Sequence, residues 1–170
     1  MPQLNDPNFA RSVVLMLHHD ADGAMGLVVN NPSDLDLGTF SRSQNMTCHA
    51  SLESLPVFRG GPVEPERGWI LHSNTSVTER KEIVPGVFLS GSPDTLKNLL
   101  AGGLLPFRLI LGYAGWDAGQ LEGEMAAGAW LTAKADPKHI LQTDPGGAWV
   151  GVLKDMGVDP STLAVAPGIH

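Results

Sequence analysis

Potential metal ligands are densest in the run His18–Asp22, which reads HHDAD. On the spacing of a calcium-binding loop, Asp20 and Asp22 could supply carboxylate oxygens. That template also needs Asp at the position of His18 and Glu at the position of Val29, so it fails. We therefore interpret the run as an acidic hairpin turn and expect no bound metal. A zinc site with distant partners stays the alternative, and it would make the protein a metal-dependent hydrolase.

The sequence offers no convincing pair of nucleophile and base. It lacks the G-x-S-x-G pattern, and its single cysteine, Cys48, excludes an internal disulfide and a multi-cysteine metal centre. Cys48 adjoins His49, but neighbouring side chains rarely point to one place, so a catalytic pair is not expected. His72 is predicted to share a strand face with Ile70 as a hydrogen-bonded residue at a sheet end. We expect no catalytic residue and no cofactor, which favours a protein that is not an enzyme.

Glycine-rich turns are candidate anion sites. Arg59–Pro62 reads RGGP and places a guanidinium beside backbone amides that no side chain covers. Leu89–Asp94 and Gly112–Asp117 resemble strand-to-helix turns that bind phosphate. Neither has a phosphate-loop pattern, and Asp94 and Asp117 each place a carboxylate where the phosphate would sit. We interpret both as turns in which side chains cap the following helix.

The helix predicted after Asp117 carries a row of polar side chains. Asp117, Gln120 and Glu124 have the spacing i, i+3, i+7 and lie on one flank, beside Trp116. Glu122 and Glu124 point in directions about 200° apart around a helix, which argues against a pair of cooperating carboxylates. The polar row is therefore a candidate interaction surface.

A binding cleft is the site that these features favour, because glycines allow close backbone approach and no catalytic pattern is present. The residues expected to form it are Arg59, Gly60, Gly61, Tyr113, Trp116, Asp117, Gln120 and Glu124. Core packing around this cleft is expected from Trp116, Leu121, Met125 and Trp130. The expected partner is a protein or a small ligand.

Alternating apolar residues and turn signals predict many short strands. Ser12–His18 and a second run from Gly23 to Val29 are predicted to form a hairpin. Further strands are expected at 57–58, 68–73, 87–90, 107–111 and 129–133. Asn31–Ser54 is polar and weakly periodic, so we expect a loop with one short helix.

Helices are predicted mainly in the second half. Ser92 is expected to cap a helix that closes at Gly102, and Asp117 is expected to cap a short helix with Gln120 in the capping-box position. Gly147–Met156 has the apolar spacing of an amphipathic helix. Strands come early and helices late, which indicates an α+β fold with a mostly antiparallel or mixed sheet.

Composition limits the possible partners. A chain of 170 residues with 42% hydrophobic residues suits a single domain spanning 1–170. The 11 basic and 18 acidic residues give a net charge of -7, which disfavours nucleic-acid phosphates and acidic membranes. No apolar run of about 18 residues and no signal-peptide pattern is present, so we expect a cytoplasmic protein that does not contact membranes.

Four segments together resemble the AlgH/YqgE family of small bacterial proteins: GAMGLVVN (23–30), FRGGPV (58–63), RGWILHS (67–73) and LGYAGWDAGQLEGEMAAGAWL (111–131). The resemblance implies one domain whose bent sheet curls toward a barrel flanked by helices. The family label of transcriptional regulator makes a DNA-binding regulator the alternative to a non-catalytic binding or regulatory domain. Family members usually carry a short apolar segment ahead of the match to Met1–Phe9, which leaves room for a missing first strand.

We predict that the protein does not bind duplex DNA directly at physiological salt. The net charge of -7 and the scattered basic residues leave little to neutralise phosphates. A fluorescence-anisotropy titration with mixed-sequence duplexes should show no saturable binding below micromolar protein. Submicromolar binding that weakens steeply with added salt would contradict this prediction and favour the DNA-binding alternative.

Overall fold

One eight-stranded sheet organises the molecule. The computed structural model describes residues 11–103 and 105–164, so the missing first strand considered ahead of Met1–Phe9 lies outside the described residues. The strands are β1 (Val14–Asp20), β2 (Gly23–Val28), β3 (Pro32–Asp36), β4 (Pro56–Arg59), β5 (Val63–His72), β6 (Lys81–Val84), β7 (Val87–Ser90) and β8 (Phe107–Asp117). Their order is β1-β2-β8-β5-β7-β6, while β4 pairs with β8 and with β3.

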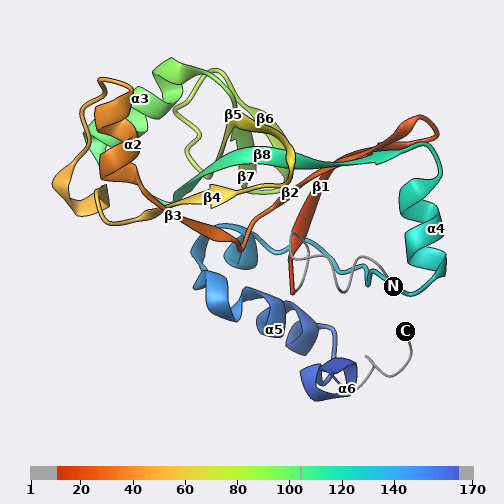
Figure 1. Cartoon of the computed structure of the whole chain (residues 1–170). Helices are drawn as coiled ribbons and strands as arrows, with labels where there is room; N and C mark the ends of the chain where they lie inside the picture. The colour runs from red at the N-terminus through yellow and green to blue at the C-terminus, as the bar shows by residue number, and fades with distance from the viewer. Residues whose placement is uncertain (1–10, 104, 165–170) are drawn as a thin grey trace.

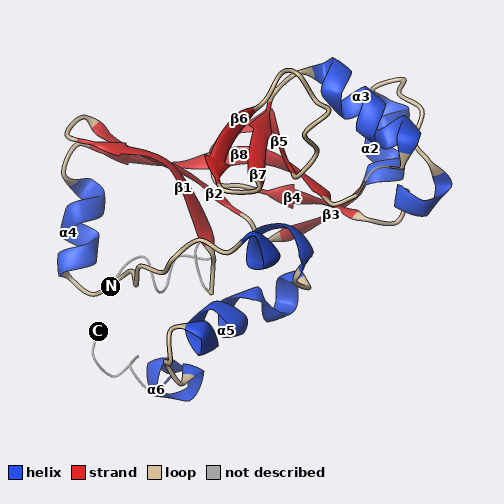
Figure 2. Cartoon of the chain, turned by 180° about the vertical axis from the view of Figure 1, so that it is seen from behind, coloured by secondary structure: helices blue, strands red, loops and turns tan. Residues whose placement is uncertain are grey.

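Helices lie around the curled sheet. The α-helices are α2 (Leu37–Ser43), α3 (Pro93–Gly102), α4 (Gln120–Ala126), α5 (Pro145–Asp155) and α6 (Pro160–Ala164), with a 3-10 turn at Ala50–Leu52 and a π-helix at Lys138–Gln142. In Figures 1 and 2, α2 and α3 lie at one end of the sheet, α4 lies beside the β1–β2 hairpin at the other end, and α5 and α6 lie along a third side. Across residues 11–103 and 105–164, no helix is long and apolar enough to cross a membrane.

The long strand β8 is the centre of the sheet. Its first half pairs antiparallel with β5 and parallel with β4, and its second half pairs antiparallel with β2. All other strand pairs are antiparallel. The result is the mostly antiparallel, mixed sheet of an α+β protein, bent into a nearly closed barrel (Figure 1), as the sequence and the family resemblance predicted.

A backbone crossing joins β4 to β5 across β8. The parallel partner β4 ends at Arg59, and the chain then passes over β8 to begin β5 on its other side. Gly60 N donates a hydrogen bond to Leu111 O (2.7 Å), and Val28 N donates to Gly60 O (2.9 Å). A Cβ atom on Gly112, where φ is +79°, would lie 2.5 Å from Gly61 O. Glycine is therefore required where these two chain segments touch.

Alternation along the central strands buries both faces of the sheet. Trp69 and Leu71 of β5 and Ile110 of β8 face one core cluster, which Ile140 and Leu141 of the π-helix cover. The intervening residues face a second cluster with the apolar side chains of α3: Ile70, Leu109, Leu96, Leu99 and Leu100. Period-two alternation with apolar residues on both faces is expected of a sheet covered on both sides.

The predicted helix ends are largely confirmed. Ser92 Oγ accepts a hydrogen bond from Asp94 N (3.2 Å) at the start of α3, and the closing left-handed residue is Gly103 (φ +64°), one position after the predicted Gly102. The amphipathic helix predicted at Gly147–Met156 is α5, which begins at Pro145 and is followed by Gly157 at φ +75°.

Several local predictions are wrong. The turn predicted at Gly112–Asp117 does not exist, because β8 continues to Asp117 and bends at Gly112 instead of ending there. The strand predicted at 129–133 is also absent, since that segment forms no ladder with a neighbour in the described chain. Within Asn31–Ser54, α2 confirms the one short helix, but β3 lies in the part expected to be loop.

A buried arginine fixes the C-terminal segment to the sheet. Arg108 of β8 donates to the carbonyl oxygens of Val29 and Thr143, each at 2.6 Å, and its guanidinium carbon lies 4.8 Å from the centre of the Phe58 ring. Burial lowers the pKa of Arg108 to about 10, so the group stays charged at neutral pH. One guanidinium thus connects the end of β2 with the end of the π-helix.

The crossing generates a stability prediction. Gly112→Ala should destabilise the protein by more than about 1–2 kcal/mol, because alanine at positive φ is strained and its methyl group meets the Gly61 carbonyl. Gly123→Ala in α4 is the control, since nothing lies within 4 Å of its added Cβ atom. That change should stabilise by about 0.5–1 kcal/mol. Urea denaturation measures both, and equal stabilities would show that the crossing tolerates side chains.

Candidate functional site

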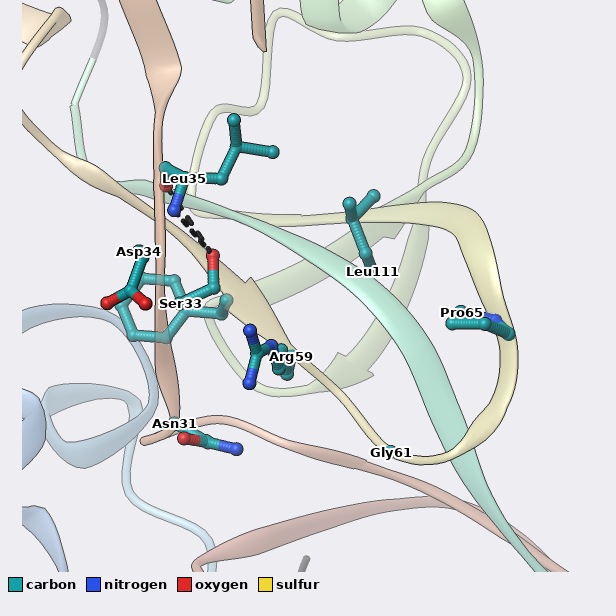
Figure 3. A pocket seen from close by; sticks show the side chains of 9 residues that line it. Asn31, Ser33, Asp34, Leu35, Arg59, Gly61, Pro65 and Leu111 are labelled. Atoms are coloured by element: carbon teal, nitrogen blue, oxygen red, sulfur yellow. Dashed lines mark hydrogen bonds between the residues drawn. The ribbon is translucent and has the colours of Figure 1, made fainter. Parts of the chain in front are cut away.

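The main pocket lies over β3, β4 and β8. Its volume is about 490 Å³, and it is lined by Asn31, Ser33, Asp34, Leu35, Phe58, Arg59, Gly61, Pro65 and Leu111. Figure 3 shows the guanidinium of Arg59 directed toward β3, between Asn31 and Ser33, with Leu111 and Pro65 farther along the opposite wall. The pocket therefore combines a cation and polar groups with apolar walls, as ligand sites generally do.

Arg59 is the cationic group of the pocket. It pairs with Leu111 across the parallel strands, so the two side chains lie on the same face of the sheet. Its backbone N–H donates to Asn31 O at 2.9 Å, which holds the strand against the chain entering β3. The ion pairs found in the described residues do not include Arg59. Its exposed guanidinium is therefore available to a ligand.

The two polar side chains that β3 brings to the pocket have different surroundings. Ser33 Oγ donates to Val57 O at 2.6 Å and accepts from Leu35 N at 3.2 Å, so its hydroxyl is already used within the fold. Asp34 is exposed and brings a carboxylate to the same pocket. The pocket thus holds one cation and one anion. A ligand with a single negative group fits this charge pattern better than a polyanion.

Tyr113 lies next to the crossing. Its ring makes an edge-to-face contact with Trp69, with ring centres 6.2 Å apart. Burial and, after it, a hydrogen bond with Glu64 raise the pKa of Tyr113 above its usual value. Glu64 adopts φ +44°, which is uncommon outside glycine, and Arg67 lies 3.5 Å from its carboxylate. These contacts hold Tyr113 at the crossing, and the residues that line the pocket do not include it.

The structure divides the eight predicted site residues between two places. Arg59 and Gly61 line the pocket, and Gly60 and Tyr113 belong to the crossing beside it. The four others, from Trp116 to Glu124, lie at the far end of β8 and on α4, next to the hairpin (Figure 1). From Leu111 to Asp117 the strand extends about 20 Å. One continuous cleft is therefore not what the geometry provides.

Glu124 is the hydrogen-bonding centre of the α4 region. Its Oε2 atom accepts from Nε1 of both Trp116 and Trp130, each at 2.8 Å, and its Oε1 atom accepts from Gln120 Nε2 at 3.3 Å. Gln120 Oε1 also accepts from Asp117 N at 2.9 Å. The carboxylate thus joins α4 to the two indoles, and we assign it a structural role.

Other predictions for this region have mixed outcomes. Trp116 and Leu121 are core residues as predicted, at 7% and 5% exposure. Met125 is not, since it is 37% exposed. The prediction that Asp117 caps α4 is wrong, because Gly119 occupies the cap position and makes no side-chain hydrogen bond. Glycine at φ +77° turns the chain from β8 into the helix instead.

The histidines also have defined positions. His72 is the satisfied residue predicted: Asn74 N donates to its Nδ1 atom (3.1 Å), so its Nε2–H donates to Ser90 Oγ (2.8 Å). Burial lowers its pKa. In the hairpin, His18 pairs with Asp20 (2.6 Å) and His19 with Glu122.

Sequence reasoning missed two groups of residues. β3 lines the pocket, but it lies in a segment that was predicted to be a loop. Its period-two pattern, with Ser33 and Leu35 on one face and Asp34 between them, was visible in the sequence. The second group is Asp136, His139 and Asp155, whose potential ligand atoms lie within 4.8 Å of one another. Asp136 and His139 are three residues apart, but Asp155 lies 16 residues beyond His139, and only the packing of α5 brings it to them.

Comparisons with known proteins agree with the fold. Residues 1–161 match the AlgH-like family. The chain is 46% identical to a UPF0301 protein of Myxococcus xanthus, over 100% of this chain and 94% of the relative, and 42% identical to one of Methylococcus capsulatus, over 99% and 91%. The bent-barrel α+β fold and these sequence matches together define the class of protein. The chain belongs to the AlgH-like family.

Solved structures show the same architecture. The solution structure of the AlgH protein from Pseudomonas aeruginosa matches with a TM-score of 0.74 and 36% identity, covering 96% of this chain and 88% of that one. A crystal structure of a Corynebacterium diphtheriae protein matches with a TM-score of 0.69 over 91% of this chain and 82% of that one. At 21% identity, this second likeness concerns the fold alone.

The Glu124 contacts revise an expectation for this region. From the sequence, Glu124→Ala and Gln120→Ala should each change stability by only about 0.5 kcal/mol as surface substitutions. With two indole donors bound to its carboxylate, Glu124→Ala should instead cost about 1.5–3 kcal/mol. Gln120→Ala is the matched control and should stay near the smaller value. Equal small losses of stability in thermal or urea denaturation would show that Glu124 acts as a solvated helix residue and that its indole contacts contribute little.

Proposed function

We propose that this protein is a non-catalytic binding domain that captures a small ligand, or the end of a protein chain, in the pocket beside Arg59. The observation that carries the proposal is the exposed Arg59 guanidinium, which has no ion-pair partner in the described residues and borders a pocket of about 490 Å³. A cytoplasmic regulatory domain that acts through such binding is the role we favour over catalysis and over direct DNA binding.

The lining residues support binding without catalysis. Ser33 carries the hydroxyl of the pocket, and its hydrogen bond to Val57 O leaves it poorly placed as a nucleophile. Asp34 is the one carboxylate among the described lining residues, but the hydrogen bonds of Ser33 Oγ go to Val57 and Leu35, so no base is bonded to that hydroxyl. The pocket can bind and orient a ligand, but its described side chains do not form a nucleophile–base pair.

The chemistry of the walls narrows the ligand class. Arg59 offers donors in the geometry that a carboxylate or a phosphate monoester accepts. Leu35, Pro65 and Leu111 provide apolar surface for the rest of the ligand. Asp34 adds a negative charge that repels a polyanion such as a nucleic-acid backbone. We therefore favour a ligand with one carboxylate and a short apolar body, which includes the C-terminus of a protein chain.

Ligand titrations test the proposal. The probes are straight-chain monocarboxylates of increasing length, phenyl phosphate and short peptides with a free C-terminal carboxylate, each added to the isotope-labelled protein and followed by backbone NMR. We expect shifts at β3, β4 and Leu111. Replacing a charge-assisted hydrogen bond costs about 1.5–3 kcal/mol, so Arg59→Gln should weaken binding about tenfold or more.

A matched variant controls for the loss of charge. Lys97→Gln removes one positive charge from the exposed face of α3, away from the pocket, and should leave the affinity unchanged. If no probe shifts the pocket resonances, or if Arg59→Gln binds as well as the parent protein, the pocket is not the binding site. Peptides that bind where free carboxylates do not would identify a protein partner.

A further inference from the structure

Three potential metal ligands meet between the π-helix and α5. Asp136 precedes the π-helix, His139 lies within it, and Asp155 is the last residue of α5. One ligand atom from each lies within 4.8 Å of the other two. His139 Nε2 and Asp155 Oδ2 are 2.6 Å apart, and Asp136 Oδ1 accepts from Lys138 N at 2.9 Å. An imidazole and two carboxylates are ligands of divalent transition metals.

Hydrogen bonds fix which nitrogen of His139 faces the carboxylates. Thr143 Oγ1 lies 3.2 Å from His139 Nδ1 and 3.1 Å from Lys138 O. That contact occupies Nδ1, so Nε2 is the nitrogen directed at the carboxylates, 2.6 Å from Asp155 Oδ2. A proton between these two atoms satisfies the contact in the metal-free protein, and a metal ion can take the place of that proton.

The surroundings suit an ion that is held on one side and solvated on the other. The side chain of His139 is 6% exposed, whereas that of Asp155 is 55% exposed. Gly151 of α5 makes room for the ring, since a Cβ atom there would lie 2.8 Å from His139 Cε1. A cavity of about 80 Å³ borders His139 and Asp155. At about 30 Å³ for each water molecule, it has room for water ligands.

We propose that Asp136, His139 and Asp155 form a binding site for one divalent transition-metal ion, best matched by Zn²⁺. Nitrogen coordination disfavours Mg²⁺ and Ca²⁺, which select oxygen ligands. Bonds of about 2.0–2.2 Å would set the ligand atoms about 3.4 Å apart in a tetrahedron. The aspartates would rotate to reach it, with Asp155 Oδ2 moving away from His139 Nε2, which now lies 2.6 Å from it. Lys134 and Lys138 lie nearby and weaken the negative potential. The ion is therefore held reversibly.

This site differs from the one considered in the sequence. The run His18–Asp22 lies in the hairpin, and its histidines are paired with Asp20 and Glu122. The sequence-based expectation of no metal rested on that run and did not consider the C-terminal segment. The new site is also independent of the pocket beside Arg59, so either proposal can fail without the other.

The test is a titration of the chelator-treated full-length protein with ZnCl₂ alone, by calorimetry and by thermal denaturation, with MgCl₂ in parallel. We expect one Zn²⁺ per chain, a rise in melting temperature with Zn²⁺, and no effect of Mg²⁺. Asp136→Asn keeps an oxygen to accept the Lys138 N–H and should leave the metal-free melting temperature unchanged. Because outer-shell changes alone cost 10–100-fold in other metal sites, it should weaken Zn²⁺ binding at least about tenfold.

Two further variants decide between explanations. His139→Gln should abolish Zn²⁺ binding, and circular dichroism shows whether it folds; if it does not, Asp136→Asn decides alone. The double variant His18→Gln and His19→Gln is the control and should bind Zn²⁺ like the parent protein. The proposal is overturned if the parent binds no Zn²⁺, because His139 and Asp155 then share only a proton. It is equally overturned if Asp136→Asn binds normally or if the hairpin control loses binding.

Discussion

The crossing of Gly60–Gly61 over Gly112 and Tyr113 is the constraint on which the rest of the structure depends. β4 and β5 lie on opposite sides of β8, so the chain must pass over that strand within Gly60–Pro62. Backbone contacts at this point leave no space for a Cβ atom on Gly60, Gly61 or Gly112. The crossing therefore fixes β4 and β5 against β8 together. It also positions the pocket, because Arg59 immediately precedes it and Pro65 follows it.

A second constraint holds the C-terminal segment in place. Arg108 is buried and charged, and its two hydrogen bonds go to carbonyl oxygens of Val29 and Thr143. Burying a guanidinium is costly, as its lowered pKa indicates, and the arrangement is favourable only when those donors are satisfied. Lysine could not reproduce it, since one ammonium lacks the planar fork that reaches two acceptors. The π-helix is thereby fixed to the sheet, and His139 with it.

Local signals predicted the elements that local residues determine. The β1–β2 hairpin, α3 and α5 were recognisable because alternation, caps and apolar spacing all lie within each segment. β3 and the continuation of β8 were missed because they depend on partners: β3 is a polar strand that exists by pairing with β4, and Gly112 bends a strand that two neighbours hold. The strand predicted at 129–133 had suitable residues but no neighbour.

The candidate site, like the fold, was predictable only where neighbouring residues in the sequence determine it. Arg59 and Gly61 were found from one local motif, and both line the pocket. The sequence joined them to Glu124, and the structure places the second half of β8 between the two groups. Residue types alone also suggested interaction for Glu124, whereas its two indole donors give it a packing role.

Contiguous bonds connect the two proposed sites. Val29 precedes the pocket segment by two residues, Arg108 links its carbonyl to Thr143, and the Thr143 hydroxyl is hydrogen-bonded to His139. A connected path is not by itself coupling, which requires an element with two arrangements that both ligands bias. Arg108 is buried, and both of its carbonyl contacts measure 2.6 Å. The path therefore explains how both sites are held by one fold, and coupling between them would need a second arrangement of this link.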